Sequence, residues 1–148
     1  MGEYKVLEEE QTLQDLVSDA ELFHPELSYK ITGILFKAHN ELGRYSREIQ
    51  YCDFIETLLI KYEYDYKREY KLGNSRNRVD FLIENKILIE VKAKDIILKE
   101  DYYQTQRYLH SLSLKLGLLV NFRAKYLRPK RIIRIDTING TRFADPNN

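Results

Sequence analysis

Apolar residues recur at helical spacing in two consecutive segments in the first half of the chain. Between residues 26 and 42 they fall on one face of a helix, and Gly43 is placed to end that helix. A second helix is predicted from a cap at Ser46 to about Tyr62. The apolar positions of the two helices are Leu27, Ile31, Ile34, Leu35, Ala38 and Leu42, followed by Ile49, Phe54, Ile55, Leu58 and Leu59.

The pattern then changes from helical spacing to alternation. Tyr62, Tyr64 and Tyr66 alternate with charged residues, which predicts a half-exposed strand. A turn is predicted around Gly73, which is followed by Asn74 and Ser75. The remaining predicted elements are strands at 78–84, 87–93, 117–122 and 131–136 and a helix at 100–115.

This order of elements predicts an α/β (α+β) fold with a central mixed sheet of four to five strands flanked by helices. The helix at 100–115 lies between two strands and implies a crossover connection. We expect the domain to span residues 25–136. An acidic, helical extension is predicted at residues 1–24, and a C-terminal tail at residues 137–148.

Charged residues interrupt both strands of the predicted hairpin, where an unpaired buried charge is costly. Glu90 and Lys92 share one face, because side chains alternate along a strand. A two-residue loop at 85–86 would put Asp80 on the opposite face. A three-residue loop at 84–86 would pair Asp80 with Glu90 and gather the aliphatic residues on the other face. We prefer the three-residue loop because it gives the cleaner core.

Two carboxylates about 5 Å apart repel each other unless a proton or a cation lies between them. A Mg²⁺ ion held by Asp80 and Glu90 would polarise a phosphodiester and activate a water molecule. Lys92 would orient that water or stabilise the charge that develops on phosphorus. From the spacing alone, an ordinary ion pair on an exposed sheet face is the favoured interpretation, because short motifs often occur by chance.

Further motifs change that balance because they occur in a fixed order around the triplet. They are ITGILFKAHNELG, an ExxY pattern at Glu48 and Tyr51, RVDFLIE, ILIEVKA, QTQRYL and LGLLVNF. Over residues of about 25–136 the chain therefore resembles the GxxExxY proteins, a branch of the PD-(D/E)XK nuclease superfamily. The resemblance implies a restriction-endonuclease-like core.

The resemblance also implies a role for each residue that matches the family pattern. Asp80, Glu90 and Lys92 match the catalytic motif of a nuclease that depends on Mg²⁺ or Mn²⁺. Glu48 matches an acid on the first core helix, which would reach the metal directly or through water. Gln104 matches a glutamine on the later helix, which would hydrogen-bond a phosphate oxygen or the attacking water.

Three tyrosines accompany these residues. Tyr45 replaces the family's glycine three residues before Glu48, so we expect a reshaped loop there. Tyr51 shares a helix face with Glu48, and Tyr108 shares one with Gln104. Tyr51 and Tyr108 either buttress the site or contact nucleic acid.

The formal net charge is only +1, but the charges are unevenly distributed. Residues 123–134 contain six bases and no acid, and such a segment favours contact with a phosphate backbone. The residues predicted to bind nucleic acid are Arg123, Lys125, Arg128, Lys130 and Arg131, with Lys94 at the end of the hairpin. The alternative is that these bases, Lys94 included, are only solvated.

Three interpretations of the function remain open after these observations. One is a metal-dependent nuclease acting on DNA. Another is a catalytically weak or inactive nuclease-fold protein that binds nucleic acid or serves a partner, including a second copy of itself. In a third interpretation, the acidic extension covers the basic segment and blocks nucleic acid.

The single cysteine, Cys52, excludes an intrachain disulfide and is typical of a reducing cytoplasm. No apolar run approaches the roughly 18 residues needed to cross a membrane, and no secretion signal is recognisable. We therefore expect a cytoplasmic protein without a membrane partner.

Overall fold

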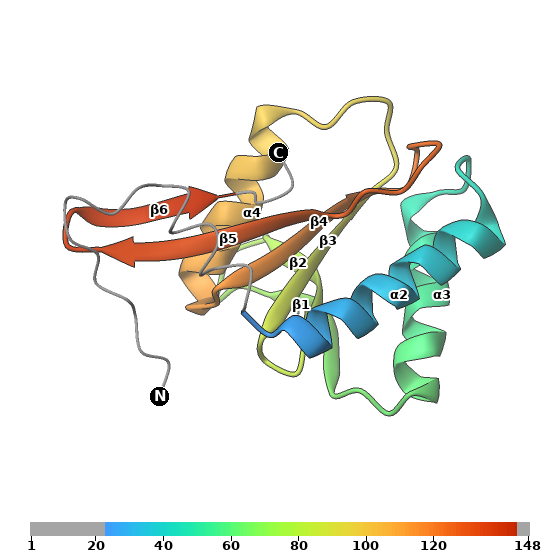
Figure 1. Cartoon of the computed structure of the whole chain (residues 1–148), viewed down its shortest axis with the longest axis horizontal. Helices are drawn as coiled ribbons and strands as arrows, with labels where there is room; N and C mark the ends of the chain where they lie inside the picture. Colours follow the sequence, from blue (N-terminus) through green and yellow to red (C-terminus); the bar gives the residue numbers. More distant parts are fainter. Residues whose placement is uncertain (1–22, 145–148) are drawn as a thin grey trace.

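The structure is a computed structural model that describes residues 23–144 and builds them around one mixed sheet (Figure 1). Three helices are described: α2 (Pro25–Leu42), α3 (Glu48–Lys61) and α4 (Lys99–Leu112). The six strands are β1 (Tyr66–Lys71), β2 (Arg78–Ile83), β3 (Ile87–Lys92), β4 (Leu116–Asn121), β5 (Lys130–Thr137) and β6 (Gly140–Ala144). The α/β prediction is confirmed. The predicted helix in the acidic extension lies outside the described residues.

The strands follow one another across the sheet in the order β1-β2-β3-β4-β5-β6. Every neighbouring pair is antiparallel except β3 and β4, which run parallel because α4 carries the chain from the end of one strand to the start of the other. The pairing of Lys92 with Asn121 brings the carboxyl ends of these two strands together. The predicted crossover is therefore confirmed.

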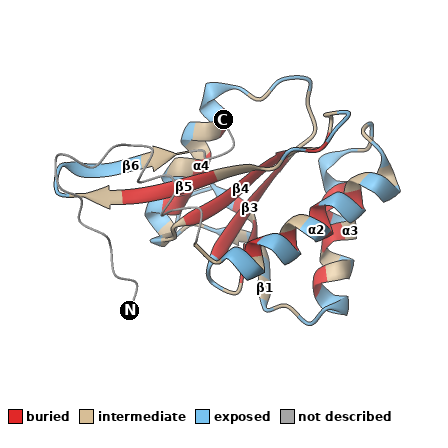
Figure 2. Ribbon diagram, viewed as in Figure 1, coloured by how far each residue is buried: buried red, intermediate tan, exposed pale blue. Residues whose placement is uncertain are grey.

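The two faces of the sheet pack against different helices. Helices α2 and α3 cover one face, and α4 covers the other (Figure 1). Figure 2 shows buried residues along the central strands and on the inner sides of α2 and α3. Phe81, Ile89 and Val91 point toward α2 and α3, whereas Leu82 and Leu88 point toward α4. The predicted alternation of the hairpin is confirmed.

Helix α4 packs closely on the sheet at Gly117 of β4. A methyl group on this glycine would lie 3.2 Å from both Leu88 Cδ1 and Thr105 Cγ2. That distance is shorter than an ordinary van der Waals contact, so a side chain at residue 117 would have to displace its neighbours. The absence of a side chain therefore fixes the depth at which α4 lies above β3.

Several predicted ends need correction. Helix α3 begins at Glu48 after Arg47, not after Ser46, and the Arg47 amide donates to Gln50 Oε1 at 2.8 Å. The first strand begins at Tyr66, not Tyr62, because α3 continues to Lys61 and Glu63 then takes a left-handed φ of 59°. Alternation among tyrosines was a misleading indicator, since the first of them follows a helix.

The C-terminal part of the domain also differs from the prediction. Helix α4 ends at Leu112 and not at residue 115. It ends there because the next residue, Ser113, takes a left-handed φ of 54°. Residues 140–144, predicted to lie in a tail, form β6 and pair with β5. The sheet therefore has six strands instead of four to five. No helix of residues 23–144 is long and apolar enough to cross a membrane.

The loop between β2 and β3 sets the register of the hairpin and depends on Asn85. Ile83 pairs with Ile87, so the loop has three residues, as predicted, and both Glu84 and Asn85 have a φ of 53°. We expect Asn85→Ala to lower the free energy of unfolding by about 1 kcal/mol, because alanine tolerates this conformation poorly. Asn85→Gly should be neutral or stabilising. Urea unfolding checks this, with Lys86→Ala as the control, and equal stability of the Ala and Gly variants would contradict it.

Candidate functional site

Asp80 and Glu90 face each other where β2 and β3 separate. The paired positions of the two strands end at Phe81 and Ile89, one residue before the two acids. Beyond that point each carboxylate accepts a hydrogen bond from the facing strand. The Asp80 amide donates to Glu90 Oε1 at 3.1 Å, and the Val91 amide donates to Asp80 Oδ2 at 2.7 Å. The predicted opposition of the two acids on one face is confirmed.

Burial makes this pair of carboxylates electrostatically costly. Glu90 is only 3% exposed. Burial, followed by the charge of Asp80, raises the pKa of Glu90 to about 8. Burial also raises the pKa of Asp80 to about 6, although the Val91 amide and Lys92 act in the opposite direction. The two acids resist being ionised at the same time, and a cation bound between them would stabilise their ionised forms.

The donor set fits a hard divalent cation of the kind the sequence predicts. Two carboxylates suffice for Mg²⁺, which completes its coordination with water and phosphate oxygens. Among residues 23–144, no three His, Cys, Asp or Glu side chains lie close enough together to hold a metal. Asp80 and Glu90 are therefore the two residues that would coordinate such an ion directly.

Glu48 is brought near the pair but not into it. It is the first residue of α3, it is exposed, and its charge contributes to the raised pKa of both Asp80 and Glu90. Gln104 lies on α4, half-buried, one turn before Tyr108. The effect of Glu48 on both acids places this residue of α3 near the pair.

Glu69 is a further acid near this pair, which the sequence analysis missed. It adopts a left-handed φ of 51° in the middle of β1, at the position facing Asp80. The pairing of β1 with β2 continues on both sides but skips this position. Its charge also raises the pKa of Asp80. Neither the alternating pattern nor any motif indicates this conformation.

Lys92 at the end of β3 and Lys94 just after it both contact the carboxylate of Asp101. Lys94 Nζ lies 2.5 Å from Asp101 Oδ2, and Lys92 Nζ lies 3.8 Å from Asp101 Oδ1. The Leu98 amide also donates to Asp101 Oδ2 at 2.7 Å, which caps α4. Burial opposes its charge, but the hydrogen bonds from Lys94 and the Leu98 amide hold the pKa of Asp101 below its ordinary value.

Asp101 was not predicted as a site residue, although one indicator was present. It is the third residue of α4, where an acid is a recognisable capping residue. What the sequence did not indicate is that the same carboxylate reaches back to β3. For Lys94 the sequence left two roles open, contact with phosphate or simple solvation. In the structure its ammonium group forms an ion pair with Asp101.

Tyr51 is a core residue, which corrects its assignment to nucleic-acid contact. Its side chain is fully buried, and its ring stacks on Phe122 with centroids 4.2 Å apart. Its hydroxyl donates to the carbonyl of Gly43 and accepts from the Ser46 amide. It therefore buttresses the loop that leads into Glu48, which is the other of the two predicted roles.

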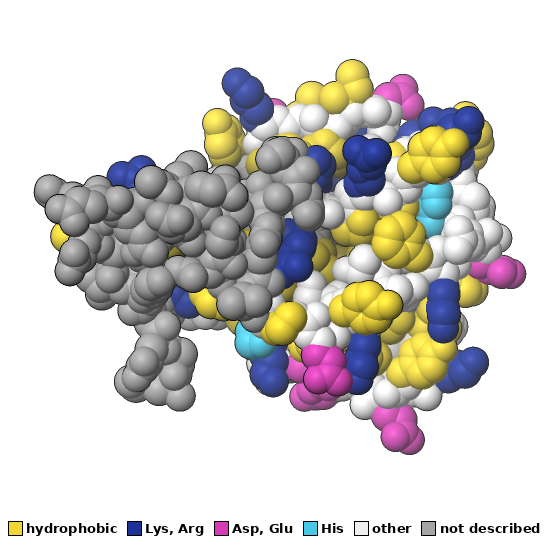
Figure 3. All heavy atoms as spheres, in the orientation of Figure 1, with side chains coloured by type: hydrophobic (Ala, Val, Ile, Leu, Met, Phe, Trp, Pro, Cys, Tyr) yellow, Lys and Arg dark blue, Asp and Glu magenta, His cyan; other side chains and the backbone are white. Residues whose placement is uncertain are grey.

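The predicted basic segment does not form one continuous surface. Arg123 Nε donates to the carbonyl of Arg44, Arg44 Nε donates to that of Arg123, and Arg134 is buried against Leu109. Lys125 and Arg128 are exposed, whereas Lys130 and Arg131 are half-buried. On the face shown in Figure 3, basic side chains are scattered among hydrophobic and acidic ones.

The reciprocal bonds between Arg44 and Arg123 fasten the α2–α3 loop to the loop after β4. Tyr45 lies in this loop and is 75% exposed. Its ring is 5.1 Å from the Arg44 guanidinium and 5.6 Å from that of Arg123. The α2–α3 loop thus carries an exposed ring beside two cations.

Comparison with protein families supports the geometry just described. A family model described as the PD-(D/E)XK nuclease superfamily matches residues 25–135, about three quarters of the chain. Comparison with curated proteins and with solved structures gives no match. The family match confirms the superfamily predicted from the ordered motifs.

The raised pKa values predict how stability depends on pH in the metal-free protein. The unfolded chain ionises these acids near pH 4, but the folded chain retains their protons to about pH 6 for Asp80 and 8 for Glu90. Stability from this pair is therefore full below about pH 4 and is lost as pH rises toward 8. We expect Glu90→Gln to raise the free energy of unfolding by about 2 kcal/mol at pH 8, and by less at pH 5.

Thermal unfolding in EDTA at pH 5, 6.5 and 8 measures this difference. Glu41→Gln is the matched control, because Glu41 is exposed on α2. Its effect should be the same at each pH. A gain for Glu90→Gln that does not grow with pH would contradict the prediction.

Proposed function

The chain belongs to the PD-(D/E)XK nuclease superfamily over residues 25–135, and we propose that it is a divalent-metal-dependent nuclease that hydrolyses phosphodiester bonds in DNA. The observation that carries this proposal is the pair of opposed carboxylates of Glu90, which is buried, and Asp80, which is half-buried, with Lys92 two residues after Glu90 on the same strand. The ordered motifs favour the GxxExxY branch of the superfamily. A structural ion pair would not require two acids to be buried against each other.

Asp80 and Glu90 would hold Mg²⁺ or Mn²⁺, and Glu48 would reach it through water. When bound, the metal would polarise the phosphodiester and lower the pKa of a bound water. Lys92 would donate to a phosphate oxygen and offset the charge that develops on phosphorus. Gln104, on α4, would hydrogen-bond a phosphate oxygen or the attacking water.

Asp101 would position Lys92 in this arrangement. Its carboxylate is fixed by the first turn of α4, and it is shared with Lys94, which lies closer to it than Lys92 does. Lys94, at the shorter distance, would compensate most of the negative charge of Asp101. The longer contact leaves Lys92 oriented while its ammonium hydrogens stay available to a phosphate.

A second candidate is a nuclease-fold protein that binds nucleic acid but does not cleave it alone. Two observations favour it: the net charge is only +1, and Tyr45 stands where the GxxExxY resemblance predicts a glycine, in the loop that leads into Glu48. In this case a partner protein, or a second copy of the chain, would complete the site. Binding of DNA without cleavage in Mg²⁺ or Mn²⁺ would distinguish it from the first proposal.

Cleavage assays on single-stranded DNA, duplex DNA and RNA test the proposed chemistry. We expect Asp80→Asn and Lys92→Met each to lower the rate by about 100-fold or more, because each removes a group that acts on the reacting phosphate. The control variants are Glu41→Gln and Lys99→Ala, which alter exposed residues outside the site. Full activity in both site variants would rule out the proposed site.

The role of Asp101 is tested separately from its structural role. Asp101→Asn keeps an acceptor for the Leu98 amide but removes the charge that orients the two lysines. We expect kcat to fall about tenfold and the pH profile to shift, while the melting temperature changes little. Asp101→Ala should also destabilise the fold by about 1 kcal/mol through loss of the cap. If Asn restores both stability and the wild-type pH profile, Asp101 has only a capping role.

A further inference from the structure

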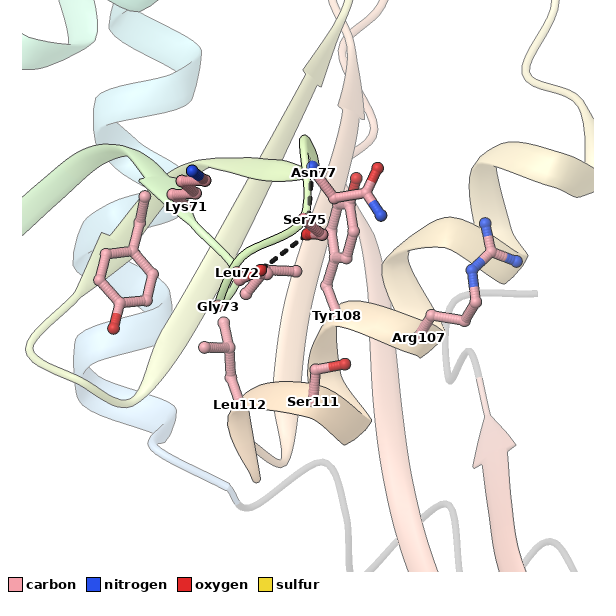
Figure 4. Close-up of a pocket in the computed structure, with 10 residues that line it drawn as sticks. Lys71, Leu72, Gly73, Ser75, Asn77, Arg107, Tyr108, Ser111 and Leu112 are labelled. Carbon is pink, nitrogen blue, oxygen red and sulfur yellow. Dashed lines mark hydrogen bonds between the residues drawn. The ribbon is translucent and has the colours of Figure 1, made fainter.

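A groove with polar and apolar walls lies between the β1–β2 turn and α4, and apart from Tyr108 its residues have been given no role above. Its volume is about 580 Å³, within the range of sites that hold small ligands. Figure 4 shows Tyr108 extending from α4 toward the turn, with Arg107 beside it on the helix. The polar residues that line the groove are Lys71, Ser75, Asn77, Arg107, Tyr108 and Ser111. The lining contains two cations and no acid.

Tyr108 offers its hydroxyl to this groove. The residue as a whole is only 4% exposed. Its hydroxyl is not among the described side-chain atoms that are buried without a partner, so it keeps access to solvent. Because Tyr108 lines the groove, a polar group bound there would hydrogen-bond this hydroxyl.

The groove adjoins the Asp80–Glu90 pair. Tyr70 and Lys71, on one wall, pair with Val79 and Arg78, so this wall ends one residue from Asp80. Tyr108 belongs to the apolar cluster under α4 together with Leu88, and Glu90 points to the same face of the sheet because it lies two residues after Leu88 on β3. A nucleic-acid strand with one phosphate bound at the carboxylates would therefore reach this groove with its neighbouring nucleotide.

We propose that this groove is the subsite for an unpaired nucleotide next to the scissile phosphate. The inference rests on the proposed nuclease function and adds a substrate class to it. Lys71 and Arg107 neutralise the flanking phosphate, and Ser75, Asn77 and Ser111 hydrogen-bond the sugar or base edge. The Tyr108 hydroxyl donates to the same nucleotide. A groove of this size admits one nucleotide but not a duplex, so the substrate enters as a single strand or a frayed end.

Arg107 and Lys71 are well suited to this role and to its test. Both are exposed, and neither forms an ion pair with another residue in the range 23–144. Removing either one therefore costs the fold little. Arg142 is a matched control, since it is an exposed arginine on β6 that lies outside both the groove lining and the basic segment.

The experiment measures affinity for fluorescent DNA without cleavage. In an Asp80→Asn background with Mg²⁺, we expect Arg107→Ala combined with Lys71→Ala to weaken binding of a single-stranded oligonucleotide about tenfold. The slope of log Kd against log salt should fall by about one for each cation removed. Tyr108→Phe should weaken binding about threefold, and Arg142→Ala less than twofold. A blunt duplex should be affected less than the single strand.

Melting temperatures within about 2 °C of the parent confirm that each variant is folded. Unchanged affinity in the groove variants, or an equal loss with Arg142→Ala, would overturn the subsite. Equal losses for single strand and duplex would overturn the assignment to an unpaired nucleotide. If the groove variants cleave DNA at the same rate as the wild-type protein, only this inference fails. If the wild-type protein neither binds nor cleaves any nucleic acid, the proposed function fails with it.

Discussion

The rest of this structure depends on the repulsion between two carboxylates that the fold buries against each other. Asp80 and Glu90 lie where β2 and β3 stop pairing, and each takes a backbone amide from the opposite strand. Those two hydrogen bonds hold the side chains in place but do not remove their mutual repulsion. The raised pKa values of both acids express the remaining cost. Such a cost is tolerated where the same charges are needed for function.

The surrounding elements all serve to keep this unfavourable pair in position. Aliphatic residues of the hairpin pack under α2 and α3, and the opposite face packs under α4. Gly117 lets α4 lie close to β3, and Asp101 links the first turn of α4 to the lysines that follow Glu90. Tyr51 fixes the loop before Glu48. Each contact lies away from the acids, but each one limits how far they can move apart.

Cations are distributed differently from the sequence expectation. The segment 123–134 has six bases, yet Arg123 and Arg134 are used to bind carbonyls within the fold. The groove beside the acids takes its cations, Lys71 and Arg107, from two separate elements. Clustering along the chain is a poor guide here, because neighbouring residues on a strand point to opposite faces.

By itself the sequence determined the elements with strong periodicity, the parallel crossover and the register of the hairpin. These features follow from local spacing and from the preference of aliphatic residues for one face. It also predicted a site at Asp80, Glu90 and Lys92, through the ordered motifs that surround them. Only the tertiary structure decided which residues surround them: Asp101, Glu69 and the groove at Tyr108 bring together segments that lie far apart in the chain. The tertiary structure also decided that residues 140–144 form a strand, because a short, exposed edge strand is specified by its neighbour β5 and not by its own pattern.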